Sequence, residues 1–235
     1  MVEKSLAFLA GRDGLPKTHF FELFDDFLDY AATDWVLTTT EAGSGDATEA
    51  VSDAAGGILL VTNANGANDY DAFQWAGVDS TSVTETFTLV AGKRLYFGAR
   101  LALGDADSSN IVIGLHDTDT DPVGNTISDG IYFDKGEDGN LDFTCAVASA
   151  ETRLTALATL ANDTYVTVEF YYNGQVDSAG AIDGMIEAYV NGLHVGSVDV
   201  ANGPTTQLAV SFAIENGAAA AETLSMDWIR CVQER

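Results

Sequence analysis

An alternating run of aspartates, Asp117-Thr118-Asp119-Thr120-Asp121, is the segment whose residue types and spacing best suit metal chemistry. Carboxylate oxygens at alternate positions can converge on Ca²⁺, as they do in calcium-binding loops. The EF-hand pattern next requires Gly and then a bidentate Glu, but Pro122 follows here. We therefore interpret the run as a solvated acidic turn, and a Ca²⁺ site is the alternative.

The histidines and cysteines offer little for catalysis. His116 lies beside Asp117, and His194 follows the Asn191-Gly192 pair. A catalytic His needs an orienting carboxylate and a nucleophile within reach, and neither neighbourhood contains a recognisable Ser or Cys motif. We expect both histidines at a strand edge or facing solvent.

Cys145 and Cys231 fall at inward-facing positions of strand-like runs, so we expect buried free thiols. A metal site would need more Cys or His neighbours than the sequence offers. No catalytic residue, metal or cofactor is therefore expected.

Several aromatic residues could bind a glycan if they stood exposed on a face or rim of the fold. Aromatic side chains at strand spacing are more often part of a core, however. The candidates are Trp75, Tyr132, Tyr171 and Tyr189.

The elements that must position these residues are β-strands, because apolar and polar residues alternate with a period of two along most of the chain. The Asn191-Gly192 pair between alternating runs is the strongest hairpin signal, and the segment Lys135 to Gly139 is a second turn. The expected strands are 20–30 (with an irregular start), 35–40, 57–62, 71–75, 82–90, 94–103, 111–115, 130–134, 141–147, 165–172, 186–190, 193–198, 208–214 and 223–232. Residues 43–53 read as an acidic surface loop.

About twelve to fourteen strands, no convincing amphipathic helix and no linker predict an all-β fold. We expect an antiparallel β-sandwich that forms one domain over residues 20–235, preceded by a short N-terminal arm, residues 1–19.

Charge is the dominant feature of the composition. The chain carries 36 Asp and Glu against 10 Lys and Arg, a net charge of −26. Coulomb repulsion therefore disfavours nucleic acid and anionic membranes as partners. The longest uncharged apolar run near the N-terminus, Ser5 to Ala10, is too short for a signal peptide core or a membrane span.

The arm differs from the acidic body, because its net charge is +1. Its apolar residues either pack onto the sandwich as an extra strand or cap, or anchor the protein to a neighbouring subunit or shell. We favour anchoring. The residues expected to make that contact are Val2, Lys4, Leu6, Phe8, Leu9, Arg12, Leu15 and Lys17.

Two strings resemble known β-folds. Residues 187–198 (EAYVNGLHVGSV) resemble a hairpin of laminin-G-like and concanavalin-A-like jelly rolls, and residues 224–232 (LSMDWIRCV) resemble the last strand of that fold. Three longer strings resemble virion structural proteins of tailed phages, especially marine ones. These are FFELFDDFLDYAATDWVLTTTEAGSGDATEA, LANDTYVTVEFYYNG and VSFAIENGAAAAETLSMDWIRCVQER.

The phage resemblance covers most of residues 20–235 and implies a jelly-roll protein present in many copies on a capsid or appendage. The arm lies outside it. Jelly rolls of this type also include glycosidases, whose retaining members place carboxylates at a Glu-x-Asp-x-x-Glu spacing on one strand. This sequence has no such run, and Glu187 and Asp227 are lone strand carboxylates.

We therefore predict a non-enzymatic capsid decoration protein that binds and stabilises the outside of a phage head. Its partners would be the major capsid protein and itself, as a homotrimer, because oligomers favour closed symmetry. It would be made in the host cytoplasm and reside on the virion exterior. The alternative is a carbohydrate-binding adhesion module on a tail or head fibre, with a surface glycan as partner. Adaptation to saline surroundings is a rival explanation of the acidity.

Overall fold

The computed structural model describes residues 19–52, 56–77, 81–136 and 139–235. Nearly all regular structure in these ranges is β-strand, with two short 3-10 helices, η1 (Ala32–Asp34) and η2 (Val200–Asn202). The strands are β1 (Phe20–Asp25), β2 (Trp35–Thr40), β3 (Thr48–Val51), β4 (Leu59–Thr62), β5 (Tyr70–Trp75), β6 (Leu95–Leu103), β7 (Ser109–His116), β8 (Gly130–Lys135), β9 (Asn140–Val147), β10 (Ala150–Thr159), β11 (Val166–Tyr172), β12 (Met185–Val190), β13 (Leu193–Asp199), β14 (Ala209–Asn216) and β15 (Thr223–Glu234). Within the described ranges, no helix has the length and apolar character needed to cross a bilayer.

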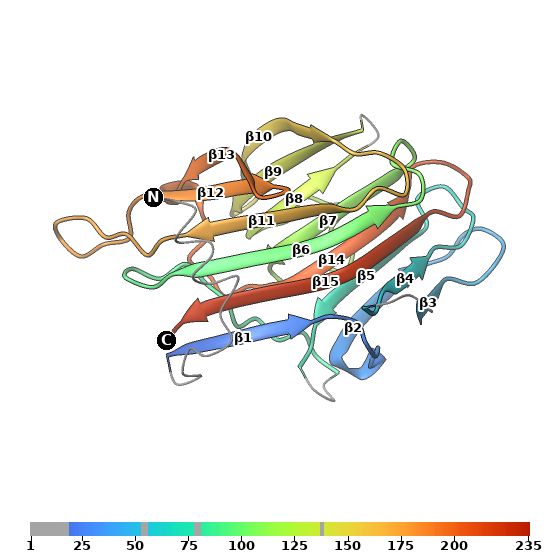
Figure 1. Cartoon of the computed structure of the whole chain (residues 1–235), viewed down its shortest axis with the longest axis horizontal. Helices are drawn as coiled ribbons and strands as arrows, with labels where there is room; N and C mark the ends of the chain where they lie inside the picture. Colours follow the sequence, from blue (N-terminus) through green and yellow to red (C-terminus); the bar gives the residue numbers. More distant parts are fainter. Residues whose placement is uncertain (1–18, 53–55, 78–80, 137–138) are drawn as a thin grey trace.

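The strands form two antiparallel sheets that face each other, with sheet A in front in Figure 1. Sheet A has the order β13-β12-β11-β6-β15-β4-β3, and β1 also pairs with β15. Sheet B has the order β10-β9-β8-β7-β14-β5-β2. The long strand β15 pairs with β6 along one edge, whereas its other edge pairs first with β4 and then with β1.

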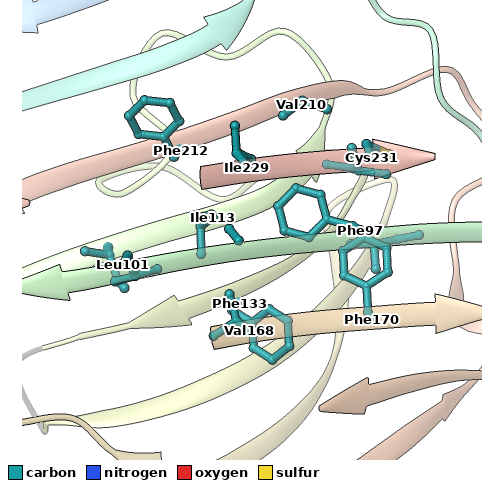
Figure 2. Close-up of a cluster of buried hydrophobic side chains, with 14 of the residues drawn as sticks. Phe97, Leu101, Ile113, Phe133, Val168, Phe170, Val210, Phe212, Ile229 and Cys231 are labelled. Atoms are coloured by element: carbon teal, nitrogen blue, oxygen red, sulfur yellow. The ribbon is translucent and has the colours of Figure 1, made fainter. Parts of the chain in front are cut away.

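The core lies between the sheets. Phe97 and Phe170 stack on sheet A with ring centroids 5.0 Å apart, and Phe73 and Phe212 stack on sheet B at 4.4 Å. Phe143 of β9 contacts Phe170 across the interface at 5.8 Å. Figure 2 shows part of this cluster, where side chains of β6, β11 and β15 face those of β7, β8 and β14. The predicted antiparallel β-sandwich is confirmed.

Most predicted strands are present, and the predicted turn at Asn191-Gly192 is confirmed. Strands β8 and β9 pair as the second predicted hairpin requires, whereas residues 137–138 of its turn lie outside the described residues. Asn191 and Gly192 adopt φ of +51° and +73°, as the tight turn between β12 and β13 requires. The sequence missed β10, an edge strand interrupted by a bulge between Leu154 and Ala158, where most side chains are exposed and the alternation is weak.

Two other predictions were wrong. Part of the predicted acidic loop 43–53 is strand β3, which pairs with β4 despite its exposed side chains. The segment predicted as a strand at 82–90 forms only isolated bridges in its described residues, 81–90. Its buried Phe87 and Leu89 alternate as in a strand, but the Gln233 side chain hydrogen-bonds both backbone groups of Thr88 in place of a neighbouring strand.

Candidate functional site

A β-bulge in β15 determines which side chains reach the outer face of sheet A. Met226 pairs with Leu101 and Trp228 pairs with Arg100, so Asp227 is an extra residue in the strand. Before the bulge, Met226 faces the core, and after it Ile229 and Cys231 do. The bulge therefore reverses the alternation and directs Trp228 and Arg230 outward, next to β6 and β1.

Residues from five strands form one row across this outer face. Backbone pairing joins Tyr189 of β12 to Glu169 of β11, Glu169 to Gly98 of β6, Gly98 to Arg230, and Arg230 to Phe24 of β1. Figure 1 shows these strands side by side. Because Gly98 lacks a side chain, the Tyr96 hydroxyl can lie over the middle of the row, close to the Trp228 ring.

A pocket of about 220 Å³ lies on this face, lined by Phe24, Tyr96, Trp228 and Arg230. A Cβ atom at position 98 would overlap the Tyr96 hydroxyl and approach the Trp228 ring to 3.2 Å. Phe24 is 55% exposed. The pocket thus combines accessible aromatic surface with polar groups, the composition that sugar rings with one apolar face and many hydroxyls require.

The polar part of the pocket includes a hydrogen-bonded pair. The Tyr96 hydroxyl donates to Glu169 Oε1 at 2.8 Å. Burial raises the pKa of Glu169, and burial together with the nearby Glu169 carboxylate raises the pKa of Tyr96 well above its ordinary value. The phenol therefore stays protonated at neutral pH, so Tyr96 can donate hydrogen bonds but is a poor general base.

Each arginine around the pocket is held by a carboxylate. Arg230 Nε donates to Glu22 Oε1 at 2.7 Å, and the guanidinium lies 5.9 Å from the centre of the Phe24 ring. Arg100 forms an ion pair with Asp227 of the bulge and stacks over the Tyr165 ring at 4.2 Å. These contacts orient the arginine side chains and leave little uncompensated charge.

The two tyrosines that the sequence proposed as glycan contacts, Tyr171 and Tyr189, lie on this same face. They pack with Tyr96, Val232 and Phe20 and are only 2% and 4% exposed. The Tyr189 hydroxyl donates to Glu187 at 2.8 Å, and its ring contacts the His194 ring with centroids 5.3 Å apart. Both tyrosines pack beside Tyr96 on this face, but neither lines the pocket.

The other two proposed aromatics lie elsewhere. Trp75 packs edge-on against Trp35, with centroids 5.3 Å apart, and belongs to the core. Tyr132 lies on the outer face of sheet B, 3% exposed, packed with Val112, Ile127 and Ala146. A second pocket beside Tyr132, about 160 Å³, is lined mainly by polar groups, and its Arg153 is paired with Asp134 and Glu151. It offers less apolar surface than the pocket on sheet A.

The Asp117–Asp121 run forms a turn held by its own carboxylates. Asp119 Oδ1 accepts from the Asp121 N–H at 2.9 Å, and Asp121 Oδ1 accepts from the Gly124 N–H at 2.9 Å. In the part of the chain that the structure describes, no three His, Cys, Asp or Glu side chains are grouped so as to hold a metal ion. The interpretation as an acidic turn agrees with this geometry.

The prediction for His116 was wrong, because this residue is fully buried. Its Nδ1 lies 2.7 Å from the Asp117 carbonyl oxygen, and the nearby Gln74 side chain binds the backbone of Asp117 and Asp119. Burial lowers the pKa of His116, so the ring is neutral and serves to anchor the acidic turn. His194 is exposed, as predicted.

Both cysteines are free and buried, as predicted. Glu187 bonds Tyr189 and Asp227 bonds Arg100, so each lone strand carboxylate has a local partner. The proposed contact residues of the arm, Val2, Lys4, Leu6, Phe8, Leu9, Arg12, Leu15 and Lys17, lie outside the described residues.

Comparisons with known proteins identify the fold. No family model and no curated protein sequence match the chain. Among solved structures, it is similar to a protein of unknown function from Shewanella oneidensis, with 16% identity, a TM-score of 0.59 and coverage of 100% of this chain and 95% of that one. It is also similar to the carbohydrate recognition domain of Emp47p, with 10% identity, a TM-score of 0.57 and coverage of 93% and 98%.

A third similar structure is the endo-β-1,4-glucuronan lyase from Trichoderma reesei, with 14% identity, a TM-score of 0.51 and coverage of 89% and 94%. At these identities the likeness concerns the fold. The chain is therefore a lectin-like jelly-roll β-sandwich, as the hairpin and last-strand resemblance predicted.

Sequence reasoning missed the residues that line the pocket: Phe24, Tyr96, Trp228 and Arg230. One signal was available for two of them. The core residues Met226 and Ile229 are three positions apart, whereas Leu224 and Met226, or Ile229 and Cys231, are two apart. That break in the period of two indicates a bulge, which turns Trp228 and Arg230 outward.

Proposed function

We propose that this protein is a non-enzymatic carbohydrate-binding module whose site is the pocket on the outer face of sheet A. The observation that carries the proposal is the pocket itself, where Trp228 and the exposed Phe24 supply aromatic surface beside Tyr96 and Arg230. Aromatic rings stack on the apolar faces of sugars, and fixed polar groups orient the hydroxyls.

Two further points support binding rather than chemistry. The Tyr96 phenol is held protonated, and each carboxylate of the site is bonded to a donor on the same face. The fold of a carbohydrate recognition domain is compatible with this function.

The experiment is a glycan array followed by titration calorimetry on the best ligand. We expect Trp228→Ala to weaken binding by at least about tenfold, because burying the surface of one large apolar side chain contributes about 1.5–3 kcal/mol. Tyr70→Ala, on the opposite sheet, is the matched control and should bind like the wild type. If no glycan binds, or if both variants bind equally well, this assignment is wrong.

We also propose capsid decoration as a second candidate function. The observation that favours it is the arm, whose apolar and basic residues differ from the acidic body. An apolar arm that docks on a shell would add burial of about 25 cal/mol per Å², and repetition on a lattice would add avidity. The partners would be a major capsid protein and further copies of this chain as a homotrimer, on the outside of a virion.

The test is to remove residues 1–19 and measure binding to purified shells. We expect the truncated protein to keep its β-sheet circular dichroism and lose shell binding. Mass spectrometry of purified particles should count hundreds of copies near a fixed ratio to the shell protein. Unchanged binding by the truncated protein refutes the anchoring role, and absence from particles refutes decoration.

A further inference from the structure

The distribution of charge in the pocket on sheet A indicates which kind of glycan it takes. We propose that the site selects neutral glycans and rejects those with a carboxylate, such as uronic acids. This inference rests on the proposed carbohydrate-binding function and names the ligand class of the same site.

The first support is that three arginines of this face are each paired with a protein carboxylate. Arg230 is bonded to Glu22, Arg100 to Asp227, and Arg94 to Glu234, where Arg94 Nε donates to Glu234 Oε1 at 2.9 Å. A ligand carboxylate would have to displace one of these protein carboxylates or share an arginine with it, and in either arrangement two negative charges compete for one positive charge. Truncating a charge pair in this way is unfavourable wherever the groups are partly desolvated.

The second support is that two acidic groups, Glu169 and Glu187, lie on the same face. Glu169 lies beside Gly98 and accepts a hydrogen bond from the neutral Tyr96 hydroxyl, and Glu187 lies one row away and accepts from Tyr189. A second carboxylate placed beside Glu169 would repel it at short range. The net charge of −26 adds long-range repulsion that slows the approach of any anion.

Neutral sugars meet neither obstacle. A hydroxyl both donates and accepts, so it can donate to the Tyr96 hydroxyl oxygen and accept from Arg230 without breaking the Tyr96–Glu169 or Arg230–Glu22 pair. The Trp228 ring beside Gly98 offers the apolar surface on which such a sugar would stack.

The experiment compares two ligands that differ only in charge. Oligosaccharides of β-1,4-linked glucose and of β-1,4-linked glucuronic acid, equal in length, are titrated into the full chain at about 0.15 M NaCl. We expect the glucose series to bind at least about tenfold more tightly. If the glucuronate series binds as tightly or more tightly, the selectivity proposed here is wrong and carbohydrate binding stands. If neither series binds, and the glycan array finds no neutral ligand, both proposals fail.

A charge-releasing variant tests the physical reason. Glu22→Gln removes the carboxylate that holds Arg230 but keeps the size of the side chain. It should strengthen glucuronate binding by about fivefold or more and leave glucose binding within about twofold. Glu151→Gln, which loosens the pairing of Arg153 on sheet B, is the matched control and should change neither affinity. If Glu22→Gln binds glucuronate no more tightly than Glu151→Gln does, the proposed selection is wrong.

Discussion

A single missing side chain shapes the pocket on sheet A. Gly98 lies directly between Glu169 and Arg230 in the sheet, and the Tyr96 hydroxyl occupies the space that a Cβ atom would need. The Tyr96–Glu169 hydrogen bond and the position of the Tyr96 side chain that lines the pocket therefore both depend on this glycine.

We expect Gly98→Ala to abolish glycan binding and to lower the free energy of unfolding by about 1–3 kcal/mol, as overpacking does. Titration calorimetry and urea unfolding measure the two effects. Gly136→Ala is the control, because no atom lies within 4 Å of a Cβ placed there. Wild-type affinity in Gly98→Ala would show that the pocket is not where the ligand binds.

Two buried aspartates in β5 and the turn before it have opposite pKa shifts. Asp69 accepts hydrogen bonds from the backbone N–H groups of Ala42, Gly43 and Gly66; although burial acts to raise its pKa, these bonds outweigh burial and lower it. Asp71 is also fully buried, and the Thr39 side chain offsets that burial only in part. Burial, reinforced by the carboxylates of Glu49 and Glu41, raises the pKa of Asp71 to about 6.

The sign of the pH effect of Asp71 follows from linkage. The folded protein keeps this proton up to about pH 6, whereas the unfolded chain loses it near 3.8. The stability contributed by neutral Asp71 is therefore full below pH 3.8 and is lost as pH rises through about 6. Asp71→Asn should be more stable than the wild type by about 1–2 kcal/mol at pH 8 and should lose this advantage near pH 4.

Urea unfolding at several pH values measures this difference. Asp69→Asn is the control, and its pH dependence should be opposite. Because folding lowers the pKa of Asp69, its carboxylate stabilises the protein at pH values above the pKa of the unfolded chain, and this stability is lost as pH falls. We expect Asp69→Asn to be less stable than the wild type by about 1–3 kcal/mol at pH 7. A constant difference between wild type and Asp71→Asn from pH 4 to pH 8 would contradict the assigned pKa.

At the scale of the element, the bulge in β15 determines which side chains of the last strand face the core. Asp227 is the extra residue, and its side chain forms an ion pair with Arg100. After it, Ile229 and Cys231 enter the core while Trp228 and Arg230 face out. The bulge is thus required by the core and by the pocket together.

Deleting Asp227 should place Trp228 and Arg230 in the core or shift the register of β15, because one residue exchanges the two faces of a strand. We expect the deletion variant to lose cooperative unfolding in urea. Asp227→Asn keeps the residue count and removes only a partly exposed ion pair, so its stability should fall by no more than about 1 kcal/mol. Equal, cooperative unfolding of the deletion variant and the wild type would mean that the bulge is dispensable.

At the scale of the whole molecule, the excess of 26 negative charges opposes compaction. The described ion pairs join only some of the acidic residues to arginines, so repulsion among the rest remains. Salt screens such repulsion over about 8–10 Å at physiological ionic strength.

We expect Tm to rise by about 3–8 °C when NaCl is increased from about 10 mM to about 0.5 M. Scanning calorimetry measures this change, and NaCl and KCl at equal concentration should act alike if screening is the cause. A Tm that is independent of salt would show that the acidic residues lie too far apart to destabilise the fold.

The strands and turns were largely predictable from sequence, and the candidate site was not. Period-two alternation located β6, β11, β12 and β13, and the Asn191-Gly192 pair located a hairpin, because these signals are local. The prediction for 82–90 was wrong for a non-local reason, since the Gln233 side chain occupies the backbone groups of Thr88.

By itself, the sequence determined that this protein is a β-sandwich with buried thiols, and that residues 20–235 are strongly acidic whereas residues 1–19 carry a net charge of +1. These properties depend on composition and on the alternation of neighbouring residues. The tertiary structure alone decided that Gly98, Glu169 and Arg230 adjoin one another, because β6 lies between β11 and β15. Alternation tells which face a side chain occupies but not which strand lies beside it, and strand neighbours are chosen by the packing of the whole core.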